Sequence, residues 1–130
     1  MTKLFLSILL ATVLLTSLVL AEPSGQADAD KGVQLYKQRR YAEAVQQLKS
    51  ALGAGVDPAK ESNLWTILGN AYDELDQYPE AIEAHKRSLE IDPKSSVVWT
   101  NLGAVYRHDQ NYPEARSCYL KALELNPDYP

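Results

Sequence analysis

Cysteine, clustered positive charge and catalytic motifs are scarce or absent in this sequence of 130 residues. Its single cysteine excludes an intrachain disulfide bond, a Cys-rich zinc site and an iron–sulfur cluster. The 13 Lys and Arg residues are outnumbered by 17 Asp and Glu residues and form no long basic tract. We therefore expect no binding to nucleic acid or to anionic membranes, which require clustered positive charge.

Motifs that mark common catalytic sites are also missing. The sequence has no Gly-rich phosphate loop, no His-Glu-x-x-His motif and no nucleophile elbow. His85 has no neighbouring ligands in the sequence with which to hold a metal, so we expect it to be a packed residue. We therefore expect a protein that is not an enzyme and that needs neither a metal nor a cofactor.

The one long hydrophobic run lies at the N-terminus. Lys3 precedes an uncharged stretch of 17 residues, Leu4–Leu20, which is followed by small and polar residues. This order is typical of a secretory signal peptide over residues 1–21, with cleavage after Ala21. The stretch is also close to the lower length limit for a bilayer span, so an uncleaved anchor is the alternative. In both cases we expect the rest of the chain on the export side of the membrane, periplasmic or secreted and not inserted.

Two segments later in the chain are copies of each other. Aligning Ser62–Pro93 with Ser96–Pro127, a shift of 34 positions, gives 13 identical residues among 32. Unrelated segments would share about two, so the sequence contains an internal repeat. The identities are concentrated in three motifs: Trp65-x-x-Leu68-Gly69-x-x-Tyr72 with Trp99-x-x-Leu102-Gly103-x-x-Tyr106, Tyr78-Pro79-Glu80-Ala81 with Tyr112-Pro113-Glu114-Ala115, and Asp92-Pro93 with Asn126-Pro127.

The spacing within each copy predicts two helices. The Trp, Leu and Tyr of the first motif are spaced as residues on one face of a helix. Gly69 lies inside this helix at a cost of about 1 kcal/mol relative to Ala, which predicts that another helix approaches closely there. Pro79 fits the first turn of a second helix, and Pro93 ends it.

A fainter copy precedes these two at a shift of 37 positions. Tyr41-Ala42-Glu43-Ala44 matches the later Tyr-Pro-Glu-Ala motif, and three extra residues fall in a loop over residues 53–58. Asp28 and Lys31 replace the Trp and Leu of the first motif, as expected for an outermost helix that no earlier repeat covers. The predicted units are a linker over residues 22–27 and repeats over residues 28–58, 62–95 and 96–130.

These motifs resemble the tetratricopeptide repeat family, and the resemblance covers about residues 27–127. It implies an all-α fold, an α-solenoid of three helix-turn-helix repeats in which stacking covers the apolar faces that single repeats expose. It also implies an adaptor or scaffold that binds a protein or peptide partner. The binding surface would be the concave face formed by the first helix of each repeat.

Residues turned away from the Trp/Leu/Tyr face would line this concave surface. In relatives that hold a peptide, asparagines at such positions bind its backbone, because an amide offers both a donor and an acceptor. Asn70 and Asn101 match two of these positions, and the alternative is that they are solvated polar residues. Thr66 stands where some relatives carry a basic residue that binds a C-terminal carboxylate, so we expect no carboxylate clamp. The weaker groove candidates are Thr66, Asp73, Thr100 and His108.

The last repeat has an edge that no later repeat covers. Solenoids usually end in a polar cap, whereas this edge carries Cys118, Tyr119, Ala122, Leu123 and Leu125. We expect it to bind a partner or a second copy of the chain, giving a homo-oligomer through the C-terminal repeat with Cys118 near the junction. The alternatives to a groove-binding adaptor are thus a self-associating structural module and, if the leader is retained, a membrane-tethered assembly scaffold.

Overall fold

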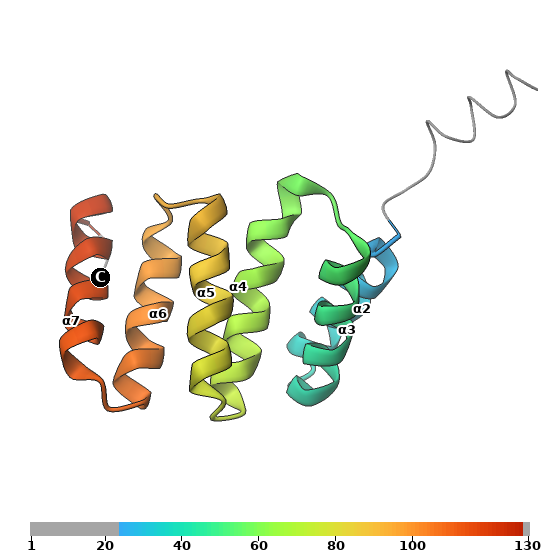
Figure 1. Cartoon of the computed structure of the whole chain (residues 1–130), viewed down its shortest axis with the longest axis horizontal. Coiled ribbons are helices and arrows are strands. Elements are labelled where there is room, and N and C mark those ends of the chain that lie inside the picture. Colours follow the sequence, from blue (N-terminus) through green and yellow to red (C-terminus); the bar gives the residue numbers. More distant parts are fainter. Residues whose placement is uncertain (1–23, 129–130) are drawn as a thin grey trace, which may run out of the picture.

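The computed structural model describes residues 24–128, which form six α-helices and no strand. The predicted all-α class is therefore confirmed. The predicted leader over residues 1–21 lies outside the described residues, and no helix within them has the length and apolar character needed to cross a membrane. The helices are α2 (Gln26–Lys37), α3 (Tyr41–Ala54), α4 (Pro58–Glu74), α5 (Tyr78–Ile91), α6 (Ser96–His108) and α7 (Tyr112–Leu125) (Figure 1).

The helices pack as three antiparallel pairs, α2 with α3, α4 with α5 and α6 with α7. We call the first helix of each pair an A helix and the second a B helix. Figure 1 shows the pairs side by side, with α7 at one end of the row and α2 and α3 at the other. The backbones of the A helices α2, α4 and α6 approach those of their A neighbours, whereas the backbones of the B helices stay farther apart. The row therefore curves toward the A helices, as the predicted solenoid requires.

The turn inside each pair has the same backbone conformation in all three repeats. Arg39, Asp76 and Gln110 occupy equivalent positions and have positive φ angles of 60°, 57° and 62°. The backbone N–H of the next residue donates in each case to the carbonyl five residues earlier, which ties the chain to the end of the A helix. Pro79 and Pro113 then lie in the first turn of their B helices, as predicted.

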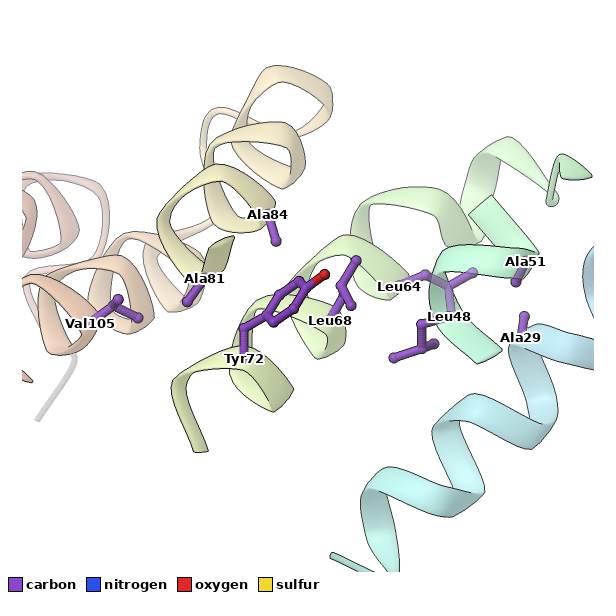
Figure 2. Close-up of a cluster of buried hydrophobic side chains, with 9 residues drawn as sticks. All are labelled: Ala29, Leu48, Ala51, Leu64, Leu68, Tyr72, Ala81, Ala84 and Val105. Atoms are coloured by element: carbon purple, nitrogen blue, oxygen red, sulfur yellow. The ribbon is translucent and has the colours of Figure 1, made fainter. Parts of the chain in front are cut away.

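The core runs along the row between the A and B helices (Figure 2) and consists largely of leucine and alanine. Alanines stand where helices cross closely, for example Ala81 and Ala84 of α5 against α4. A second cluster joins Leu89 of α5 to Val98 and Leu102 of α6. Both clusters lie between consecutive elements, so the stacking of the repeats itself buries the apolar surface.

The predicted close approach at the helical glycines is confirmed. A Cβ atom at Gly69 would lie 2.8 Å from the imidazole ring of His85, and one at Gly103 would lie 2.9 Å from the ring of Tyr119. These separations are well inside van der Waals contact. The glycine of each A helix therefore makes room for a bulky side chain from the B helix of the same repeat.

Candidate functional site

The strongest candidate site is the inner face of the row, formed by α2, α4 and α6, which we call the A-helix face. At its centre Asn101 of α6 donates from Nδ2 to Oδ1 of Asn70 on α4, at 3.2 Å. Both side chains are half-buried. This bridge uses one donor of Asn101 and one acceptor of Asn70. The carbonyl oxygen of Asn101, and the amide hydrogen of Asn70 that is not bonded to Tyr36, therefore keep hydrogen-bonding capacity.

A second polar pair joins the same two helices near their C-terminal ends. Nδ1 of His108 lies 2.8 Å from Oδ1 and 3.1 Å from Oδ2 of Asp73. Asp73, Glu74, Asp76, Tyr78 and His108 line a hollow of about 360 Å³ at this end of the face. Three carboxylates and one histidine make this hollow acidic, so it favours a positively charged side chain.

Tyr36 extends the polar row from α4 to α2. Burial raises the pKa of its hydroxyl, and the negative charge of Glu74 raises it further, while a hydrogen bond with Asn70 lowers it. Tyr36 was not among the residues predicted from the sequence, although at the shift of 37 positions it is equivalent to Asp73, and this equivalence was the available signal. The A-helix face thus carries side chains from all three repeats.

Unlike the two asparagines, the candidates Thr66 and Thr100 have hydroxyl groups that are engaged in hydrogen bonds within the protein. The Thr66 hydroxyl donates to the carbonyl oxygen of Ser62 at 3.0 Å and lies 2.8 Å from the hydroxyl of Ser88 on α5, so it is directed into the α4–α5 interface. Thr66 still borders a second hollow of about 300 Å³ between the N-terminal parts of α4 and α6. Thr100 donates to the carbonyl oxygen of Ser96 at 2.9 Å, within its own helix. Neither hydroxyl is therefore free to hold a ligand in the way the asparagines are.

The opposite side of the row carries two apolar grooves that the sequence analysis did not single out. One has a volume of about 370 Å³ and is floored by Trp65, Leu68 and Tyr72 of α4. The other has a volume of about 500 Å³ and is floored by the equivalent residues of α6. A lysine of the preceding B helix, Lys49 or Lys86, lines each groove. The recurrence of these lysines at a shift of 37 positions was the available sequence signal.

Two reactive side chains are withdrawn from solvent. His85 is fully buried, and burial lowers its pKa to about 4 although the charge of Asp73 opposes this shift. Cys118 is buried against Leu89, Val98 and Leu102, and burial raises the pKa of its thiol. Cys118 and Ala122 therefore face the core and not the exposed edge of the last repeat, which corrects the expectation that Cys118 lies near a junction. Among residues 24–128 no group of three or more His, Cys, Asp or Glu side chains is placed to hold a metal ion.

Comparison with known proteins supports the same architecture. The family model for the tetratricopeptide repeat matches residues 62–95 and 96–129. A comparison of the sequence with curated proteins gives no match.

Several solved structures are similar to more than four fifths of the chain. The first tetratricopeptide repeat domain of Spaghetti (RPAP3), bound to the HSP90 peptide SRMEEVD, is 22% identical with a TM-score of 0.73, covering 84% of this chain and 84% of that chain. The Hsp90 co-chaperone Cns1 from Saccharomyces cerevisiae is 22% identical with a TM-score of 0.79, covering 85% of this chain and 36% of that chain. The Arabidopsis OM64 repeat domain is 21% identical with a TM-score of 0.73, covering 82% of this chain and 85% of that chain. At these identities the similarity establishes the fold.

Proposed function

The chain belongs to the tetratricopeptide repeat family, and on that premise we propose that it is an exported adaptor that binds an extended segment of a partner protein along the A-helix face. As an adaptor it acts by binding, and it has no catalytic role. The paired asparagines of α4 and α6 carry the proposal. They meet at the centre of the face and keep unused donors and acceptors there.

Preorganisation gives this face its affinity. The helices on either side of the asparagines are fixed by the core, so the receptor loses little conformational freedom when a segment binds. An extended segment presents backbone N–H and C=O groups that are free to pair with amide side chains. The partner is therefore recognised first through its backbone, and the neighbouring hollows select its side chains.

The acidic hollow beside Asp73 and His108 suits a lysine or arginine of the bound segment. Its carboxylates Glu74 and Asp76 belong to the last turn of α4 and the turn that follows. A C-terminal carboxylate is a poorer ligand, because Thr66 stands where some relatives carry a basic residue and its hydroxyl is already bonded to Ser62 and Ser88. The HSP90 peptide bound by the Spaghetti domain supports the class of ligand, a short peptide, and not its sequence.

Export is the second part of the proposal. The uncharged Leu4–Leu20 stretch after Lys3 supports a leader, cleaved after Ala21. A retained leader would make the protein a membrane-tethered scaffold with the same binding face. Mass spectrometry of the N-terminus of the protein recovered from an exporting host distinguishes the two forms, and intact Met1 would contradict cleavage.

The groove is tested with labelled six-residue peptides that contain one lysine, compared with the same peptides carrying glutamate instead. We expect the full chain to bind the lysine peptides more tightly in fluorescence anisotropy. The Asn70→Ala, Asn101→Ala double variant should lose roughly tenfold or more in affinity, because two backbone hydrogen-bonding groups are removed. Gln46→Ala, which removes an exposed amide from α3, is the matched control and should bind normally. Unchanged affinity in the double variant, with an unchanged helical CD spectrum, would remove the assignment.

A further inference from the structure

The outer face of α7 carries three of the five large hydrophobic residues that are exposed among residues 24–128. Leu120 and Leu123 are 57% and 47% exposed, and Tyr112 beside them is also exposed. Their neighbours Cys118 and Ala122 are buried on the opposite side of the same helix. No element among residues 24–128 lies against this outer face, which is at one end of the row (Figure 1).

Comparison of the three B helices shows which of these residues the fold itself requires. Leu123 is equivalent to Leu89 of α5, which is only 8% exposed because α6 covers it. Leu120 is different, because its equivalents in α3 and α5 are the exposed Lys49 and Lys86. Stacking of repeats therefore does not call for a leucine at this position. The substitution of lysine by leucine makes the terminal helix apolar where the inner B helices are charged.

Helix α2, at the other end of the row, is not complementary to the apolar outer face of α7. In α2 the positions of the Trp and Leu of the first motif are held by Asp28 and Lys31. Asp28 already accepts a hydrogen bond from Ser50 at 2.7 Å, and Lys31 is exposed. Packing α2 of one molecule on α7 of another would bury these charges against leucines, which is unfavourable. Head-to-tail growth of the solenoid is therefore disfavoured.

The charged side chains on the outer face of α7 are instead complementary to those of a second α7 that runs in the opposite direction. Arg116 stands four residues before Leu120 and Glu124 four residues after it, so all three lie on one stripe of the helix. Both charged side chains are exposed, and Glu124 is bonded only to Lys121 of its own helix. Rotating the helix by a half-turn about an axis through Leu120 exchanges the positions of Arg116 and Glu124.

We propose that α7 is a self-association surface that pairs antiparallel with α7 of a second copy, about a two-fold axis at Leu120. The two Leu120 side chains meet at the axis, and Arg116 of each copy lies opposite Glu124 of the other. An interface of this isologous kind closes after two copies and leaves the A-helix face free. One helix from each copy buries less than the roughly 1,200 Å² of a standard interface, so the dimer is weak and forms at high concentration.

Sedimentation equilibrium over a concentration series of the full chain tests this proposal. We expect a reversible monomer–dimer equilibrium. Leu120→Lys restores the residue of the inner repeats, so it should fold normally and weaken the dimer by roughly tenfold or more. Ile91→Lys adds the same charge at an exposed apolar residue of α5 and should leave the dimer unchanged. A chain that stays monomeric at all concentrations, or association that persists in Leu120→Lys, overturns the proposal; the latter result would indicate association through another surface, such as the N-terminal segment.

Charge reversal tests the antiparallel pairing itself. Arg116→Glu alone places two acidic side chains opposite each other, and Glu124→Arg alone places two arginines opposite each other. Each single variant should therefore weaken the dimer, and the double variant should restore it, since both pairs are then complementary again. Thermal unfolding monitored by CD checks that all three variants remain folded. A double variant as monomeric as the single ones would overturn the two-fold arrangement.

Discussion

The imidazole ring of His85 packs directly on Gly69, at the place where Tyr119 packs on Gly103 one repeat later. In the first repeat Leu48 occupies the equivalent position against Gly32. The repeats thus use one B-helix position to fill the space that the glycine leaves, with three different side chains. His85 is the one that places polar atoms in a fully buried position, and neither of its ring nitrogens has a hydrogen-bond partner in the described part of the chain.

The close packing at Gly69 predicts that Gly69→Ala destabilises the protein, although alanine usually stabilises a helix relative to glycine. An alanine Cβ at Gly69 would collide with the His85 ring at 2.8 Å, and overpacking of this kind costs about 1–3 kcal/mol. The higher helix propensity of alanine offsets about 1 kcal/mol of this. We expect Gly69→Ala to lower the free energy of unfolding in urea denaturation.

Gly53 provides the matched control for this change. It lies in α3, and a Cβ added there would have no atom within 4 Å, so only the propensity gain applies. Gly53→Ala should raise the free energy of unfolding by up to about 1 kcal/mol. Equal effects of the two substitutions would show that the His85 ring does not limit the space at Gly69.

Burial of His85 predicts that stability falls in mild acid. In the unfolded chain His85 takes up a proton near its usual pKa of 6.5, whereas in the folded protein burial lowers its pKa to about 4. Between these values the unfolded state binds more protons, so the free energy of unfolding decreases as the pH falls from 6.5 toward 4 and changes little more below it. The full loss from this one group is about 3 kcal/mol. Urea denaturation at a series of pH values measures it.

Replacing His85 by the residue of the first repeat isolates this effect. His85→Leu places in α5 the side chain that Leu48 places in α3, and it removes two buried nitrogens that lack partners. We expect the variant to be more stable at neutral pH by about 1–3 kcal/mol. Its stability should also change less between pH 6.5 and 4 than that of the original chain, because the buried histidine is gone. An identical pH profile in the variant would assign the acid sensitivity to other groups.

The sequence predicted those features that repeat along it. The close approach at Gly69, the prolines of the B helices and the polar first helix follow from residues that recur, or fail to recur, at fixed positions. The helical phase also placed Asp73 and His108 on one face. Their pairing was not predictable, because it depends on how near α4 and α6 lie at their C-terminal ends.

The orientation of single side chains could not be predicted from the sequence. Thr66 satisfies the helical phase of the A-helix face, yet its hydroxyl is bonded to Ser88, 22 residues further along the chain. Cys118 belongs to the terminal helix, yet it faces the core. In the first case the position of Ser88 on the neighbouring helix α5 decides the outcome, and in the second the rotation of α7 about its own axis. The spacing of apolar residues fixes that rotation only approximately.

The hydroxyl cluster of Ser62, Thr66 and Ser88 allows stability and binding to be separated. Ser88 is fully buried, and its hydroxyl donates to the carbonyl oxygen of Ser62 at 2.9 Å while it lies 2.8 Å from the Thr66 hydroxyl. Thr66→Val keeps the shape of the side chain and removes this contact, so the free energy of unfolding should fall by about 1 kcal/mol. Ser117→Ala, at an exposed serine of α7, should change it by less than about 0.5 kcal/mol.

Peptide affinity measured on Thr66→Val then decides whether Thr66 contributes to the binding face. Its hydroxyl is already engaged in the α4–α5 interface, so we expect the lysine peptides to bind Thr66→Val as tightly as the original chain. Asn70→Ala should show the opposite pattern, with weakened binding and nearly unchanged stability, because the Asn70 amide is half-buried and partly free. A loss of affinity in Thr66→Val comparable to that in Asn70→Ala would mean that the hydroxyl turns toward the ligand on binding. The two variants together thus separate the residues that hold the repeats together from those that hold the partner.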